Sequence, residues 1–117
     1  MNYDELSDDD IDHLVAVEIY GENNARRITS GVIVSDRHGL FSPCVSWADA
    51  GPIILSSLIS IDPNYKFTDD TEEALAPTGT WRAEHVEKDG RSFGSSDKNP
   101  LRAAMVAFLM MHEAKNA

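Results

Sequence analysis

The sequence has few of the features that mark a secreted or membrane protein. It contains a single cysteine, Cys44, so no disulfide can form within the chain and a reducing compartment is expected. No apolar run approaches the roughly 20 residues that a membrane-spanning helix needs. The N-terminus begins with polar and acidic residues, which is unlike a signal peptide. We therefore expect a cytoplasmic protein that does not contact a membrane.

Basic residues are scarce as well. Ten Lys and Arg stand against twenty Asp and Glu, so the net charge is −10 and the pI is about 4.6. Binding to nucleic acids and to anionic membranes depends on basic side chains that neutralise phosphates. The composition therefore disfavours direct binding to DNA or RNA and favours a basic protein surface, including one that otherwise holds nucleic acid.

Motifs for catalysis and for metal or phosphate binding are missing. The four histidines do not have a zinc-binding spacing with one another or with Cys44. No segment has the pattern of an EF-hand loop or a glycine-rich phosphate loop. A nucleophilic Cys44 would need a nearby base and a lowered pKa, and the neighbouring sequence supplies neither. We therefore expect no catalytic residue, no metal and no cofactor, and a protein that is not an enzyme.

The chain does have enough apolar residues for a core. Its 117 residues are 42% apolar and fit one small domain, residues 1–117. Residues 99–111 predict a helix, because Asn99 is a favoured N-cap and Pro100 suits the first helical position. From Ala103 onward this helix is apolar on every side, which predicts a central core helix. A core helix that also forms a homodimer contact is the alternative.

A second, acidic helix is expected before Gly21. Ser7 and Asp10 have the spacing of a capping box, with Asp in place of Glu. The apolar face of this helix is formed at helical spacing by Ile11, Leu14, Val15 and Ile19. The carboxylates at its start suit the helix dipole. They are also the candidate partner-binding residues: Asp8, Asp9, Asp10 and Asp12.

The middle of the chain predicts one more helix and several strands. The helix is expected to begin near Ser46 or Asp49, with Gly51 and Pro52 in or just before its first turn, and to end before Pro63. Its apolar surface is Ile53, Ile54, Leu55, Leu58 and Ile61. Strands are expected at residues 31–34, 65–68 and 80–86, and a tight turn at Asp89-Gly90 returns the chain at 91–93. An acidic surface segment is expected at 69–77. The fold class is α+β, a small antiparallel sheet packed with helices around a central C-terminal helix.

Polar and aromatic residues gather where the predicted helices begin. They can serve as caps and core aromatics. The alternative is a groove in which helix N-termini and two Trp rings hold a nucleotide-like or carboxylate ligand. The candidate ligand-binding residues are Trp47, Asp49, Gly51, Trp81, Asn99 and Arg102.

Three motifs carry a family resemblance. Residues 42–54 (SPCVSWADAGPII), 81–83 (WRA) and 99–111 resemble the phage NinX-like family, as does the opening segment 1–7 before an acidic helix. The resemblance implies an α-β-α sandwich-like fold and a phage or prophage accessory protein in the bacterial cytoplasm. It implies no particular activity.

The leading interpretation is a non-catalytic accessory protein that binds a host or phage protein, to blunt a defence or redirect DNA metabolism. DNA mimicry is a specific version, and it needs carboxylates grouped on one face. The alternative is a protein that binds a small ligand and sequesters a nucleotide signal, through the residues named above.

Overall fold

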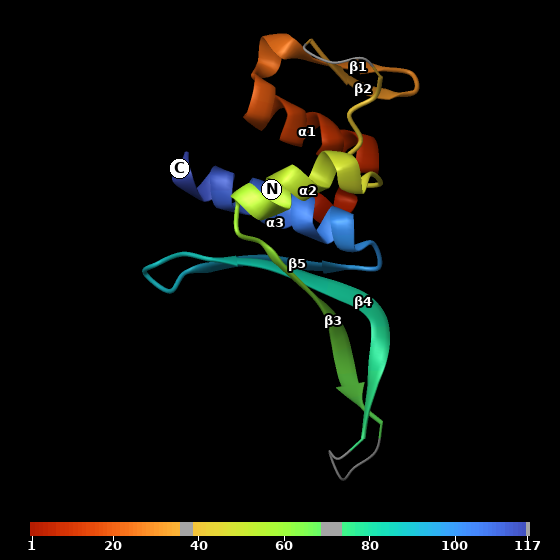
Figure 1. Ribbon diagram of the computed structural model, residues 1–117, viewed down its shortest axis with the longest axis vertical. Helices are drawn as coiled ribbons and strands as arrows, with labels where there is room; N and C mark the ends of the chain where they lie inside the picture. Colours follow the sequence, from red (N-terminus) through yellow and green to blue (C-terminus); the bar gives the residue numbers. More distant parts are fainter. Residues whose placement is uncertain (36–38, 69–73, 117) are drawn as a thin grey trace.

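Three helices lie between two antiparallel sheets in the computed structural model, which describes residues 1–35, 39–68 and 74–116 (Figure 1). The helices are α1 (Asp8–Tyr20), α2 (Trp47–Ser56) and α3 (Pro100–Lys115). One sheet pairs β1 (Ala25–Ile28) with β2 (Gly31–Val34), and the other has the order β3 (Ser60–Phe67), β4 (Leu75–Val86), β5 (Ser92–Asp97). The α+β class is confirmed. The layers run hairpin, helices, sheet, which differs from the helix–sheet–helix order implied by the resemblance.

The C-terminal helix α3 is central, as predicted. The Oδ1 atom of Asn99 accepts hydrogen bonds from the amides of Leu101 (2.9 Å) and Arg102 (3.3 Å), and Pro100 occupies the first turn. One side of α3 packs on β4 and β5, and the other side packs on α1 and α2. Its apolar residues are therefore buried all round: Leu101, Ala103, Ala104, Met105, Val106, Ala107, Phe108, Leu109 and Met111.

The N-terminal helix α1 begins and ends where the sequence predicts. The amide of Asp10 donates to Ser7 Oγ (3.1 Å) and the amide of Ser7 donates to Asp10 Oδ2 (2.9 Å), which completes the capping box. Gly21 ends the helix at φ +90°. Ile11 and Val15 are fully buried, but the prediction for Ile19 is wrong, because it lines a surface pocket at the edge of the core and is 41% exposed.

The prediction for α2 is right about its start and wrong about its end. Ser46 caps it through a bond from the amide of Asp49 to its Oγ (3.3 Å), so Pro52 falls in the second turn and not the first. The helix stops because Leu58 adopts a left-handed conformation (φ +54°) and the amide of Ile59 donates to the carbonyl of Ile54 (3.1 Å). This is a Schellman ending, in which glycine is the usual left-handed residue. Leu58 and Ile61 therefore lie outside the helix, and Ile61 belongs to β3.

The strand predicted at residues 31–34 is confirmed as β2, the other predicted strands are longer than expected, and β1 was not predicted at all. The Asp89-Gly90 turn is confirmed, with Gly90 at φ +92°, and β5 extends beyond the expected residues to Asp97. Of the expected segment 69–77, residues 69–73 lie outside the described residues and the end, 75–77, belongs to β4. β1 was not predicted because residues 22–29 are mostly polar. Only one residue of this strand, Ala25, is buried, so the sequence shows no alternation of apolar and polar residues there.

Strands β3 and β4 project away from the helices as a two-stranded arm (Figure 1). We define the arm as residues 64–68 and 74–80, because β5 pairs with β4 only from Trp81 to Val86. The β3–β4 register shifts between Pro63 and Tyr65 at the base of the arm. There Asn64 Nδ2 donates to Thr80 Oγ1 (2.9 Å) and to Ser96 Oγ (3.3 Å), which holds the base against β5. The arm helps to give the molecule its elongated dimensions of 55 × 34 × 25 Å.

Candidate functional site

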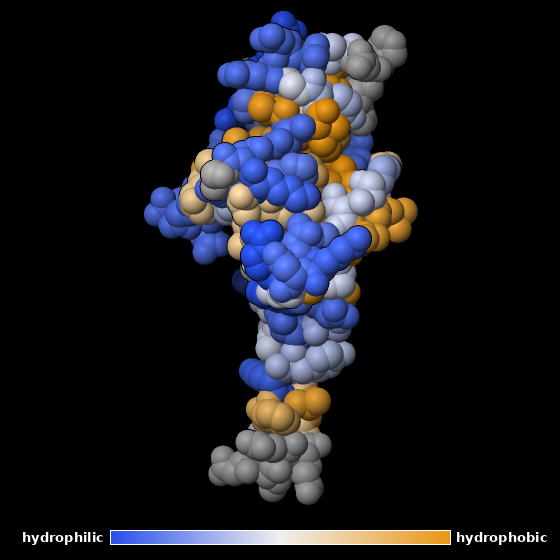
Figure 2. All heavy atoms as spheres, turned by 90° about the vertical axis from the view of Figure 1, so that its left-hand side faces the viewer, coloured by the Kyte–Doolittle hydropathy of each residue, from blue (hydrophilic) through white to orange (hydrophobic). Residues whose placement is uncertain are grey.

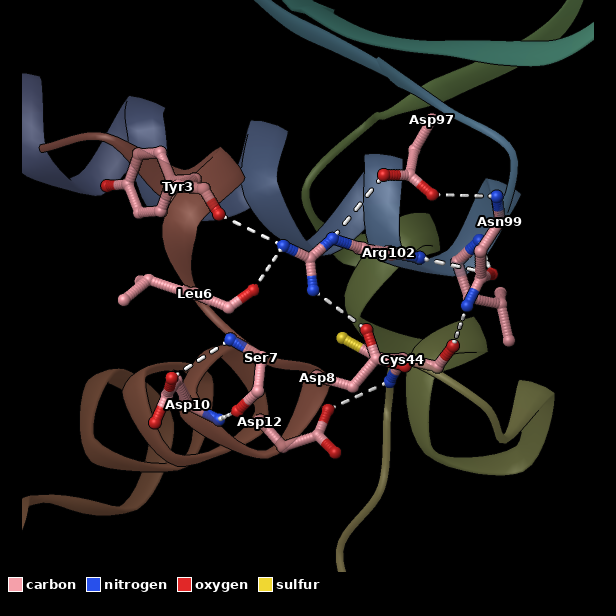
Figure 3. Close-up of polar contacts among 11 residues, drawn as sticks. Tyr3, Leu6, Ser7, Asp8, Asp10, Asp12, Cys44, Asp97, Asn99 and Arg102 are labelled. Atoms are coloured by element: carbon pink, nitrogen blue, oxygen red, sulfur yellow. Dashed lines mark hydrogen bonds and ion pairs between the residues drawn. The ribbon is translucent and has the colours of Figure 1, made fainter.

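Arg102 connects the N-terminal segment, α1 and β5 to the start of α3 (Figure 3). Its guanidinium donates to the backbone carbonyls of Tyr3 (3.0 Å) and Leu6 (2.6 Å) and pairs with Asp8 (2.8 Å) and Asp97 (3.4 Å). Burial alone would lower the pKa of Arg102, but Asp8 and Asp97 outweigh it and hold the pKa above its ordinary value. The side chain thus satisfies groups of its own chain, and its donors are committed there.

The neighbouring Asn99 extends this junction to the segment before α2. Its Nδ2 donates to the carbonyl of Cys44 (2.6 Å), while its backbone amide donates to Asp97 (2.8 Å). The amide of Cys44 in turn donates to Asp12 Oδ1 on α1 (2.9 Å). Segments far apart in the sequence are therefore joined by one continuous set of hydrogen bonds. We call the set of Arg102, Asn99, Asp97, Asp8, Asp12 and Cys44 the junction.

Two junction groups have pKa values shifted by burial. The pKa of Asp12 is raised to about 6, mainly by burial and in smaller part by the carboxylates of Asp8 and Asp9, against the opposing bond from the amide of Cys44. Burial also raises the pKa of the Cys44 thiol, and Asp12 adds to the effect. A raised thiol pKa disfavours the thiolate that a nucleophile requires.

Most carboxylates at the start of α1 bond to other groups of the same chain. Asp12 is only 2% exposed, and Asp8 is paired with Arg102. Asp10 closes the capping box and pairs with Arg27 on β1 at 2.6 Å, and these bonds lower its pKa. Asp9 is the exposed member of the four. The start of α1 therefore does not offer the grouped surface carboxylates that DNA mimicry would need.

The other predicted ligand-binding residues lie apart from Arg102. Trp47 is 59% exposed at the start of α2, and Trp81 lies at the base of the arm. Asp49 Oδ2 accepts from the amide of Ser42 (2.8 Å), so it fixes the loop before α2. Gly51 faces open space. The structure thus joins Asn99 and Arg102 in the junction, and places Trp47, Asp49 and Gly51 on α2.

A pocket of about 360 Å³ opens beside α2. Its walls are apolar except for Tyr20, Asp49 and Ser56, and it is lined by neither Trp ring. Tyr20 and Phe41 meet edge to face there, with ring centroids 5.6 Å apart. Its size is at the lower end of small-molecule sites. No cluster of three or more metal-ligating side chains occurs among residues 1–35, 39–68 and 74–116.

The arm carries an apolar face that no core covers. Tyr65 pairs with Pro77 and Phe67 pairs with Leu75, and cross-strand partners lie on the same face of a sheet. Residues two apart also share a face, so these four side chains point to one side of the arm. Tyr65, Phe67 and Leu75 are each more than half exposed. Figure 2 shows hydrophobic residues just above the grey end of the arm.

The two edges of the arm differ in their free backbone groups. The amide of Thr68 donates to the carbonyl of Ala74 (3.0 Å), and inward and outward pairs alternate along an antiparallel ladder. The backbone groups of the pairs Phe67–Leu75 and Tyr65–Pro77 therefore point outward. Pro77 has no amide N–H, so the β4 edge has one donor fewer with which another strand could pair. The β3 edge keeps the amide N–H groups of Tyr65 and Phe67 as donors.

The arm was not among the predicted sites, although its signal is present in the sequence. Apolar residues alternate at 65 and 67 and again at 75 and 77, on either side of an acidic segment. Such alternation predicts strands with one apolar face. It could have identified a hairpin, but not that the hairpin leaves the body of the protein.

No helix among the described residues has the length and apolar character needed to cross a membrane. No curated protein sequence matches the chain. A family model does match it: the model described as bacteriophage P22, NinX aligns with residues 2–112.

Proposed function

Because this chain belongs to the bacteriophage P22 NinX family, it is a phage-encoded accessory protein, and we propose that it works by binding a basic host or phage protein with its arm. The proposed action is non-catalytic and takes place in the bacterial cytoplasm. It blocks or redirects the bound protein, and direct binding to nucleic acid or membrane plays no part in it.

The observation that carries this proposal is the exposed apolar face of Tyr65, Phe67, Leu75 and Pro77. A two-stranded hairpin is marginally stable in water when nothing covers it. Exposed apolar strands with open edges also invite aggregation, so a protein that retains one is expected to use it. Covering half-exposed side chains of this size stabilises a complex by about 1 kcal/mol each.

The charge around the arm favours a basic partner. The segment that connects its strands, residues 69–73, contains four carboxylates among five residues in the sequence, and Lys66 is the only basic residue of the arm. The whole chain has a net charge of −10. Electrostatic attraction would accelerate encounter with a basic surface and repel a second copy of this chain from the arm.

Capture from lysate of infected host cells tests the proposal. The baits are the full chain, a variant with Tyr65→Ser, Phe67→Ser and Leu75→Ser, and the control Val86→Ser, an exposed apolar residue on β4 outside the arm. We expect the wild type and the control to retain the same basic protein, with weaker retention at high salt. Equal retention by the arm variant would refute the proposal, and so would no retained protein.

The pocket beside α2 favours a second candidate function, the binding of a small ring-shaped ligand. Its aromatic walls suit the stacking of a flat heterocycle. A thermal-shift screen with nucleosides and nucleotides tests this, because a ligand of the folded state raises the melting temperature. A supporting ligand would lose its effect in Ser56→Phe, which fills the pocket from its rim. No shift from any compound would exclude this class of ligand.

A further inference from the structure

The surface of α2 differs from the rest of this strongly acidic chain because it is almost free of charge. Between Gly39 and Ile61 the sequence has one charged side chain, Asp49, although 26% of all residues are charged. Asp49 is half-buried and bonded to the amide of Ser42. A surface without charge is the place where two chains of net charge −10 can approach with the least repulsion.

The outward side of α2 is apolar, although its inward side already supplies the core contacts. Ala50 and Ile53 face the core. Ala48, Gly51, Pro52 and Leu55 follow one another at helical spacing on the opposite side, and Leu55 is 77% exposed. Hydrophobic residues also gather at the edge of the molecule at the level of the helices (Figure 2). We call Ala48, Gly51, Pro52 and Leu55, with the adjoining Leu58, the α2 face.

Two residues of the α2 face, Gly51 and Leu58, are unfavourable for the backbone conformation at their positions. Gly51 stands inside a helix, where it costs up to about 1 kcal/mol relative to Ala. An added Cβ there would meet nothing within 4 Å outside the adjoining residues, and its φ is not positive, so the one local reason for glycine is the following Pro52, which disfavours the helical conformation of a residue that carries a Cβ. Leu58 occupies the left-handed position that favours glycine, at φ +54°, and it is 78% exposed. The exposed, left-handed Leu58 is not explained by contacts within the chain.

We propose that the α2 face binds the α2 face of a second copy, in an antiparallel, two-fold symmetric pair. Ala48 and Leu55 lie equally far from the centre of the face, between Gly51 and Pro52. In an antiparallel pair, the small Ala48 of one copy therefore faces the large Leu55 of the other, as a two-fold contact requires. Gly51 at the crossing allows the two helices to approach closely, and Leu58 extends the apolar contact beyond the helix.

Charge and symmetry together favour a second copy over another protein. A partner attracted by the acidic chain would be basic, and the α2 face, unlike the arm, adjoins no acidic segment of the sequence that would attract it. The face is self-complementary in size and carries no like charges to repel its copy. A single helix face covers less than the about 1,200 Å² of a standard interface, so we expect a weak, concentration-dependent dimer.

Sedimentation over a range of protein concentrations tests the dimer. We expect the average mass of the wild type and of the control Val86→Glu to rise with concentration, from the 12.9 kDa of one chain toward twice that value. Leu55→Glu should remain at the mass of one chain, because it places two like charges in the contact. A wild type that is monomeric at every concentration overturns the proposal, as does a Leu55→Glu variant that dimerises like the wild type.

Two further variants separate the dimer from the fold. Leu58→Gly should raise the unfolding midpoint of dilute, monomeric protein, because glycine suits the left-handed position that ends α2. Gly51→Ala and Leu58→Gly should each weaken the dimer several-fold, since the first adds a methyl group at the crossing and the second removes contact area. A gain in stability without any change in dimerisation would overturn the assignment of these residues to the contact.

Cysteine trapping tests the antiparallel geometry, because the one native cysteine, Cys44, is buried. An equimolar mixture of Ala48→Cys and Leu55→Cys should form a disulfide-linked dimer under mild oxidation. Either variant alone should not, because equivalent positions lie about 10 Å apart along the helix axis, beyond disulfide reach. Equal cross-linking of each variant with itself, or none in the mixture, overturns the proposed pairing.

Discussion

The junction around Arg102 and the arm both place side chains in an unfavourable environment, but of opposite kinds. In the junction, charged groups lie inside the protein, and each is bonded to another part of the same chain. In the arm, apolar groups lie outside and contact no core. The motif around Asn99 and Arg102, which suggested a ligand site, thus explains how the fold is held together. The two surfaces proposed to interact with other molecules are apolar: the α2 face overlaps the motif at residues 42–54, and the arm contains no motif.

Loss of the junction should have the largest effect on stability. Arg102→Met leaves Asp8, Asp97 and two backbone carbonyls without their donor, so we expect the free energy of unfolding to fall by about 3 kcal/mol. Urea unfolding measures this. A loss below roughly 0.5 kcal/mol, typical of surface positions, would show that the junction does not hold the fold together.

Asp12→Asn tests how the buried charge of the junction affects stability. The substitution removes the charge and keeps the side-chain oxygen that accepts from the amide of Cys44. Since the pKa of Asp12 is raised to about 6, the folded protein binds more protons than the unfolded chain between about pH 4 and 6. Wild-type stability therefore falls through this window as the pH rises. We expect the variant to be more stable at pH 7 by about 2 kcal/mol, less any cost of the buried amide.

The control for this prediction is the same pair of proteins at pH 4, where Asp12 is protonated in the fold. The stability difference should nearly vanish there, and urea unfolding across the pH range would detect it. A difference that does not change with pH would mean that the charge of Asp12 is not the cause.

Asn99→Ala should have an intermediate effect. It removes the cap of α3 and the bond to the carbonyl of Cys44, so we expect a loss of about 1 to 2 kcal/mol. Asn99→Ser is the matched comparison, since serine keeps a capping oxygen and loses the amide donor to Cys44 without adding a charge. Equal losses in the two variants would assign the effect to the bond with Cys44 and not to the cap.

Changes in the arm should have the smallest effect on stability. Phe67→Ser is expected to change the free energy of unfolding by less than about 0.5 kcal/mol, because the side chain is exposed and supports no core. Thermal unfolding monitored by circular dichroism measures this. A loss comparable to that of Asn99→Ala would mean that the arm is part of the folded body, and the contrast drawn above would fail.

Local features of the fold could be predicted from the sequence. The caps at Ser7 and Asn99 involve residues two or three positions apart, and the Asp89-Gly90 turn is equally local. The end of α2 could not be predicted, since it depends on Leu58 in a conformation that leucine rarely adopts.

The site depends on contacts that no local pattern contains. The partners of Arg102 on the N-terminal segment are more than 90 residues away, so its role was hidden from sequence. The exposure of the arm's apolar face could not be predicted either. Alternating apolar residues such as Tyr65 and Phe67 give the same sequence pattern in a strand whose apolar face is buried. The family match adds the phage origin of the chain and leaves its partner to experiment.

The most direct test of the central claim is site-specific photocrosslinking along the arm in infected host cells. A photoreactive phenylalanine is placed at Phe67 or Leu75 on the apolar face, and at Lys66 or Ala76 on the opposite face. The account predicts that positions 67 and 75 cross-link to the same basic protein and that positions 66 and 76 do not. Equal cross-linking from both faces, or from neither, would contradict it.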